Sequence, residues 1–347
     1  MILLTERHLG TESLIHWEGT DMLIDEVSAK CNLLGYSPKT FKTYWHWIES
    51  FLRHERTLSG EWVHPTKLGR KEIERFLTHL AVKQHVSPNT QNLALQGILF
   101  LYRHVLKIDI QGVNAMRAKK PLYIPTVLSS DEVRRLFSQL SGRNRLLAGL
   151  GVGCGLRIGE CFNLRIKDIL FDERQIHIRQ AKGAKDRMVQ LPEALIPALR
   201  DQIADTERIH AIDMAEGCAR VPIPFALERK SPRLAQEIGW WWLFISHVRS
   251  VDPETKRVGR WHLDETSYTR ELAAAGRRAG IRKPVKSHAL RHTFATQLMN
   301  NNVPIVQIAE LMGHQSIETT HIYTHCMERG ATSVRSPLDR LLSPVLN

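Results

Sequence analysis

The sequence predicts a mainly α-helical protein with a small β-sheet, divided into two domains. Its length of 347 residues exceeds that of one typical domain. Apolar residues recur at spacings of three and four toward both ends of the chain, as in amphipathic helices. Between residues 166 and 191 the pattern is strand-like instead, with alternation around residues 176–178.

The first domain is expected to be a small helical bundle over residues 21–115. Residues 1–20 show no clear periodicity and are expected to form a leader. The pairs Ser37-Pro38 and Ser87-Pro88 each combine a capping residue with a proline at the first helical position. Residues 70–82 form a further amphipathic stretch between the two helices that these pairs begin.

The second domain is expected over residues 128–347, after a basic, proline-bounded linker at residues 116–127. Ser129 and Ser130 can cap its first helix, and acidic residues follow where the helix dipole favours them. Glycines interrupt the next apolar run, and residues 176–191 predict a β-hairpin. The pattern between residues 195 and 260 predicts no definite element, and helical patterns resume at Ser267.

Composition narrows the class of protein. Hydrophobic residues make up 43% and charged residues 24%, and the longest apolar run is too short to span a bilayer. The five cysteines form no CxxC pair, so neither a disulfide framework nor a zinc site is expected. No secretory signal is visible, so we expect a cytoplasmic protein without a membrane partner. The net charge of +12 favours a polyanion partner, although solvated basic faces explain such a charge equally well.

Four short segments carry candidate chemistry. They are Gly155-Leu156-Arg157-Ile158-Gly159-Glu160, the turn at Lys182, Ser287-His288-Ala289-Leu290-Arg291-His292, and Met312-Gly313-His314 followed by Tyr323.

Each segment taken alone has a simpler explanation. Ser287 can cap a helix in which Arg291 lies at the edge of the apolar stripe, where a local carboxylate could pair with it. Gly313 predicts a helix stop that fixes His314, and a further helix capped by Ser316 would carry Tyr323. That tyrosine could be a half-buried packing residue, and Lys182 a solvated turn residue.

The order and spacing of these segments together resemble the tyrosine recombinases, also called phage-integrase-type recombinases. The resemblance covers residues 128–326, and residues 21–106 look like the DNA-clasping core-binding domain of that family. It implies an N-terminal helical core-binding domain and an α+β catalytic domain. It also implies site-specific cleavage and rejoining of DNA.

A segment at about residues 205–265 narrows the resemblance, because it looks like the insertion of integron integrases. The similar stretches are Pro224-Phe225-Ala226-Leu227-Glu228-Arg229-Lys230-Ser231-Pro232, Trp240-Trp241-Trp242-Leu243-Phe244, Arg260-Trp261-His262-Leu263-Asp264-Glu265, and, in the helical domain, residues 86–92 and 100–102. Ile245 and Trp261 depart from the usual pattern, which has Pro and His there. These departures concern base recognition rather than cleavage.

The resemblance implies a role for each candidate residue. Arg157 and Arg291 would bind the non-bridging phosphate oxygens with paired, charge-assisted hydrogen bonds. Tyr323 would attack the phosphorus. Lys182, with Lys185 as its rival, would protonate the leaving 5′-oxygen. His288 would accept or share the tyrosine proton, and His314 would hydrogen-bond the phosphate. Glu160 is expected to pair near Arg157 as a structural residue. No ATP, metal ion or other cofactor is implied.

The implied partners are double-stranded attachment sites, folded single-stranded hairpin sites and three further copies of the chain in a homotetramer that exchanges gene cassettes. A cytoplasmic, nucleoid-associated location follows from this use. Candidate DNA-contacting residues are Trp240, Trp242, Trp261, His262, Lys119 and Lys120. The tryptophans could be a platform for unstacked bases or the core of a small subdomain. The open alternatives are a phage-type integrase, a chromosome-dimer resolvase, a type IB topoisomerase and a non-catalytic DNA-binding protein.

Overall fold

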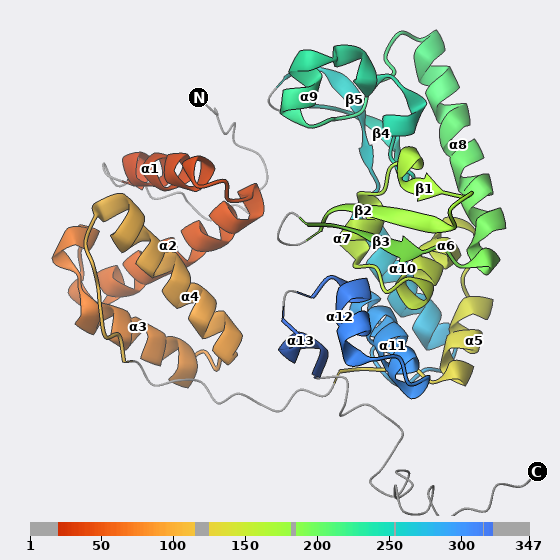
Figure 1. The fold of residues 1–347 in the computed structure, drawn as a ribbon. Coiled ribbons are helices and arrows are strands. Elements are labelled where there is room, and N and C mark those ends of the chain that lie inside the picture. The colour runs from red at the N-terminus through yellow and green to blue at the C-terminus, as the bar shows by residue number, and fades with distance from the viewer. Residues whose placement is uncertain (1–19, 115–124, 182–184, 253–254, 315, 322–347) are drawn as a thin grey trace, which may run out of the picture. The chain divides into compact units, whose positions relative to one another are not determined.

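The computed structural model describes residues 20–114, 125–181, 185–252, 255–314 and 316–321. The chain divides into two compact units, residues 1–122 and residues 123–347 (Figure 1). No helix in the described ranges is long and apolar enough to cross a membrane.

The first unit is the helical bundle that the sequence predicts. Its helices are α1 (Thr20–Leu33), α2 (Pro38–Ser59), α3 (Arg70–Val82) and α4 (Pro88–Phe100), and α4 continues into a π-helical turn at Leu101–Leu106. Ser37 and Ser87 cap α2 and α4 by accepting hydrogen bonds from the backbone N–H of Thr40 and Thr90, which confirms both expected helix starts.

The core of this unit depends on close packing between α2 and α4. A Cβ on Gly97 would lie 3.2 Å from the Tyr44 backbone oxygen, so a glycine lets the two helices approach. The buried Tyr102 hydroxyl lies 2.8 Å from the Pro65 carbonyl oxygen and 3.1 Å from that of Leu68, which ties the end of the bundle to the α2–α3 connection.

The second unit combines helices with two small antiparallel sheets. Its helices are α5 (Ser130–Ser138), α6 (Gly142–Gly153), α7 (Ile158–Phe162), α8 (Ile196–Ala215), α9 (Phe225–Lys230), α10 (Glu265–Arg278), α11 (Ser287–Asn300), α12 (Ile305–Met312) and α13 (Glu318–His321). One sheet has the order β1 (Ile169–Leu170), β2 (Gln175–Ala181) and β3 (Lys185–Gln190), and the other pairs β4 (Ile245–Val251) with β5 (Val258–His262). The predicted hairpin at residues 176–191 is therefore confirmed.

Two local expectations are wrong. The glycines expected to interrupt the apolar run lie partly inside α6, because the absent side chains at Gly151 and Gly153 leave room for Leu290 and Pro192. Ser287 is the first residue of α11 and not its cap. The capping position is Lys286, and no side chain caps this helix end.

The stretch that predicted no definite element forms a subdomain at one end of the second unit (Figure 1). It contains the second half of α8, α9, and the β4–β5 hairpin, and its buried residues form a separate small core around Trp241 and Trp242. The fully buried Asp213 on α8 holds the hairpin by pairing with Arg249 and Arg260.

Candidate active site

The site begins at Gly155, whose backbone has a left-handed conformation. Gly155 has a φ of +65°, and a Cβ there would lie 2.3 Å from the Phe294 ring, so no other residue fits without displacement. After this turn the chain enters α7, with Arg157 at the N-terminal capping position of the helix. The turn also directs the Gly155 carbonyl oxygen toward the Arg291 guanidinium, which donates a hydrogen bond to it.

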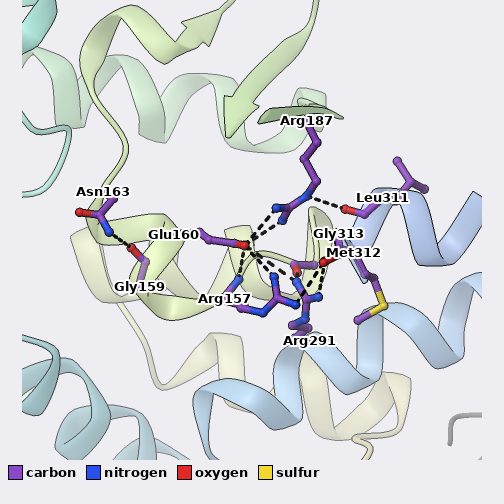
Figure 2. A network of polar contacts seen from close by, with 10 residues as sticks. Arg157, Gly159, Glu160, Asn163, Arg187, Arg291, Leu311, Met312 and Gly313 are labelled. Atoms are coloured by element: carbon purple, nitrogen blue, oxygen red, sulfur yellow. Dashed lines mark hydrogen bonds and ion pairs between the residues drawn. The ribbon is translucent and has the colours of Figure 1, made fainter. Parts of the chain in front are cut away.

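Glu160 is the anion at the centre of the site. Its carboxylate accepts hydrogen bonds from the backbone N–H and the side chain of Arg157, both at 2.8 Å. Arg187 donates to the two carboxylate oxygens at 3.0 and 2.8 Å, and Arg291 lies 3.9 Å away. Figure 2 shows the three guanidiniums gathered around this one carboxylate. One negative charge therefore faces three positive charges, which leaves a field that favours a further anion.

The same three arginines also bind three consecutive backbone carbonyls at the end of α12. Arg187 Nε donates to the Leu311 oxygen at 3.0 Å, Arg291 donates to that of Met312, and Arg157 Nη2 lies 3.4 Å from that of Gly313 (Figure 2). Gly313 ends α12 with a φ of +60°, which confirms the predicted helix stop. The carbonyls and Glu160 thus hold the arginines from two sides.

The ionisation of Glu160 follows from this arrangement. Burial alone would raise the pKa of its carboxyl, but the hydrogen bonds and charge of Arg187, with further bonds from Arg157, outweigh burial and lower the pKa to about 2. Glu160 is therefore ionised at neutral pH. The expectation that it pairs with Arg157 is confirmed, at 2.8 Å.

The two histidines expected in the site lie beside the arginines. Burial and the charges of Arg291 and Arg157 lower the pKa of His288, and the same causes with the charge of Arg187 lower that of His314 to about 4. Both rings are therefore neutral at pH 7. His314 Nδ1 lies 2.7 Å from the hydroxyl of the buried Thr320, which fixes the ring orientation.

Four of the six expected catalytic residues are thus brought together, namely Arg157, His288, Arg291 and His314. Lys182 and Tyr323 lie outside the described residues. The helix that Ser316 was expected to cap is described over α13, and the Glu318 backbone N–H donates to the Ser316 hydroxyl at 3.2 Å.

Arg187 was not predicted as a site residue from the sequence, although its place in the strand pattern indicates a buried charge. It lies on β3 two residues before the buried Val189, and therefore on the same face of the strand. A charged side chain on an apolar face needs a buried partner, and here that partner is Glu160.

The aromatic residues of the insertion surround a cation. Arg165 lies 3.8 Å from the Trp242 ring centroid and 5.3 Å from that of Trp240, and it donates to the backbone oxygens of Trp240 and Pro222. Trp242 is 8% exposed, so in this structure it packs in the core and does not present a free platform. Trp240 is half-buried, and the Lys167 ammonium lies over its ring.

The other candidate DNA contacts fall into two groups. Trp261 and His262 are half-buried on β5, and the His262 ring stacks on Phe162 with a centroid distance of 5.9 Å. Lys119 and Lys120 lie outside the described residues. Within the described ranges, no group of three or more His, Cys, Asp or Glu side chains is placed to hold a metal ion.

Comparison with known protein families agrees with this fold and site. Residues 126–329 match the model of the phage integrase family, and residues 23–112 match that of the phage integrase N-terminal SAM-like domain. The chain belongs to the phage integrase family. It is a site-specific tyrosine recombinase.

Relatives of this class cover nearly the whole chain. A protein named integrase/recombinase from Escherichia coli is 40% identical over 320 residues, which are 92% of this chain and 94% of the relative. Tyrosine recombinase XerA from Thermococcus kodakarensis is 30% identical over 305 residues, which are 87% and 90% of the two chains.

Solved structures share the fold at lower identity. XerH site-specific recombinase bound to difH substrate in a pre-cleavage complex is 21% identical with a TM-score of 0.55, covering 88% of this chain and 82% of that one. A lambda integrase dimer bound to a COC′ core site is 15% identical with a TM-score of 0.56, covering 91% and 98%.

Proposed function

We propose that this recombinase is an integron integrase, which inserts and excises gene cassettes at attachment sites on DNA. The observation that carries the chemical part of the proposal is the convergence of Arg157 and Arg291 on Glu160, next to His288 and His314. Four functional groups from three separate segments, around an excess of positive charge, suit a phosphodiester.

The arginines act on the phosphate. Cleavage adds negative charge to the non-bridging oxygens, and two planar guanidiniums stabilise it by paired hydrogen bonds. The Arg157 side chain is 26% exposed and that of Arg291 is 4% exposed, so Arg157 is the more accessible of the two. His314 supplies a third donor: when its Nδ1 accepts from Thr320, Nε2 carries the hydrogen and can donate to a phosphate oxygen.

Tyr323 is the proposed nucleophile. Its hydroxyl oxygen bonds to phosphorus and the bond from phosphorus to the 5′-oxygen breaks, which leaves a 3′-phosphotyrosine and a 5′-hydroxyl. His288, with its lowered pKa, is neutral and can take the tyrosine proton, while Lys182 gives a proton to the leaving oxygen. Rejoining reverses these steps with the 5′-hydroxyl of another strand, so the energy of the bond is retained.

The insertion supports the narrower assignment. Between α8 and α10 it adds a small core and half-buried aromatic rings at Trp240, Trp261 and His262, and Lys167 and Arg165 bring positive charge to the Trp240 ring. Aromatic faces next to cations suit unstacked bases of a folded single-stranded hairpin. By the same family resemblance we propose a DNA-bound homotetramer and a cytoplasmic, nucleoid-associated location.

A covalent trap tests the chemistry. A nicked suicide substrate that carries the attachment site should accumulate a protein–DNA adduct with the unaltered chain, and Tyr323→Phe should abolish the adduct while DNA binding persists. Equal adduct yields from the two proteins would refute the role of Tyr323.

A second experiment tests the integron assignment. We expect tighter binding to a hairpin site with extrahelical bases than to the same hairpin without them, and Trp240→Ala and Trp261→Ala should reduce that difference. Because Trp242 is buried, Trp242→Ala serves as the control for loss of packing. Equal affinity of the unaltered protein for the two hairpins would leave another kind of tyrosine recombinase as the assignment.

A further inference from the structure

Arg187 is the arginine of the site to which the proposed chemistry gives no role. Its side chain is 10% exposed and comes from β3, which begins just after the turn that contains Lys182. Its guanidinium faces Glu160 with two hydrogen bonds, at 3.0 and 2.8 Å, and its Nε donates to the Leu311 oxygen at 3.0 Å. All three nitrogens of the Arg187 guanidinium therefore face protein groups.

The contacts of Arg187 reach each part of the site. Each Glu160 oxygen that accepts from Arg187 also accepts from Arg157, and Oε2 lies 3.9 Å from Arg291. If Arg187 were absent, the carboxylate would lose two of its hydrogen bonds and could rotate or move. The two phosphate-binding arginines would then lose a fixed partner.

The approach of Arg187 to α12 is also built into the backbone. A Cβ on Gly313 would lie 2.9 Å from Arg187 Nη1, so the glycine that ends the helix leaves space for this guanidinium. The residue after that glycine is His314. Arg187 therefore contacts α7 through Glu160 and contacts the turn that carries His314 through Leu311.

We propose that Arg187 is a positioning residue for DNA cleavage: it fixes Glu160 and the end of α12, and so holds Arg157, Arg291 and His314 in the geometry that the phosphate requires. This inference rests on the proposed roles of those three residues. A purely structural Arg187 would contribute to folding, but it would not act through Glu160 on the rate of cleavage.

The proposal predicts a specific loss in Arg187→Gln. Because misplacement by about 1 Å can slow an enzyme by about 100-fold, we expect the rate of adduct formation to fall by about 10- to 100-fold. The affinity for DNA should change by less than about threefold, since Arg187 is directed at protein groups rather than at the phosphate. Arg187→Lys, which keeps the charge but loses the fork, should recover part of the rate.

The pH dependence should change as well. The groups that face Glu160 are Arg157, Arg187 and Arg291, with the Cys161 thiol beside it. Loss of one of the three cations lets burial raise the pKa of Glu160 from about 2. The acidic limb of the rate profile should therefore move to higher pH in Arg187→Gln.

The decisive experiment is a double-mutant cycle on the full chain. Single-turnover rates of adduct formation on the nicked substrate, with enzyme in excess, are measured for the unaltered protein, Arg187→Gln, Glu160→Gln and the double variant. Arg174→Gln is the matched control, because Arg174 pairs with Glu193 beside the same sheet but 63% of its side chain is exposed.

Because part of the effect of Arg187 passes through Glu160, its substitution should slow Glu160→Gln by a smaller factor than it slows the unaltered protein, and Arg174→Gln should keep the unaltered rate. Losses that multiply, or an Arg187→Gln rate and pH profile equal to those of the unaltered protein, would overturn the proposal. If Arg187→Gln does not fold, Arg187→Lys in the same cycle decides between these outcomes. Failure of the proposed function looks different, since the Tyr323→Phe protein would then form the adduct.

Discussion

Glu160→Gln replaces the central carboxylate by a neutral amide of the same size. At pH 7 the folded protein holds this carboxyl with a pKa of about 2, against 4.5 for the free group. That difference corresponds to about 3 kcal/mol of folding free energy. Removing one partner of a buried ion pair costs about 3–5 kcal/mol, which agrees with the value from the pKa difference. The expected loss of stability in Glu160→Gln is therefore about 3 kcal/mol.

The sign of the pH dependence follows from the lowered pKa. The contribution of Glu160 is complete above pH 4.5 and is lost as pH falls through the folded value of about 2. The stability difference between the two proteins should shrink from about 3 kcal/mol at pH 7 to about 1.4 kcal/mol at pH 3.

Urea-dependent hydrogen exchange of peptides from α6 and α11 measures this difference for the second unit alone. A difference below about 1 kcal/mol at pH 7, or one that does not change between pH 7 and pH 3, would refute the argument.

Two further predictions concern the turns around the arginines. Gly155→Ala should destabilise the second unit by at least about 2 kcal/mol in urea unfolding, because φ is +65° and the new Cβ would meet the Phe294 ring, whereas Gly159→Ala, with open space around it, should be neutral or slightly stabilising. Equal effects of the two substitutions would contradict the packing argument. His314, whose pKa falls from 6.5 to about 4 on folding, takes up its proton more readily when unfolded, so stability should fall as pH drops from 6.5 toward 4. Between pH 7 and pH 5, His314→Gln should lose about 1–2 kcal/mol less folding free energy than the unaltered protein loses. An equal dependence of stability on pH in the two proteins would contradict the lowered pKa of His314.

Local signals in the sequence predicted several of the local features of the fold, although the cap expected at Ser287 was wrong. The caps at Ser37 and Ser87, the cap expected at Ser129 or Ser130 and the stop at Gly313 each depend on residues within a few positions along the chain. All four are found in the structure, where Ser129 is the cap. The β-hairpin was equally visible, because alternation along a strand is also a local pattern.

Features that depend on distant partners were not visible. Arg187 makes sense only with Glu160, which is 27 residues away, and with Leu311, which is 124 residues away. Likewise, the three adjacent tryptophans gave no indication of which ring would be buried. Trp242 becomes part of the core because the chain brings Arg165 against it. An isolated antiparallel β-bridge joins the two residues and the Arg165 guanidinium lies over the Trp242 ring, which spacing alone does not reveal.

The three consecutive carbonyls at the end of α12 have an evolutionary consequence. The arginines recognise the main chain there, so the identity of the residue at position 311 is constrained by packing and not by the reaction. The number of residues is constrained more severely, because one insertion or deletion would offset every carbonyl from its guanidinium and shift His314 with them. Among related sequences, positions 311 and 312 should vary in composition, whereas the glycine at 313 and the length of the stretch should stay constant.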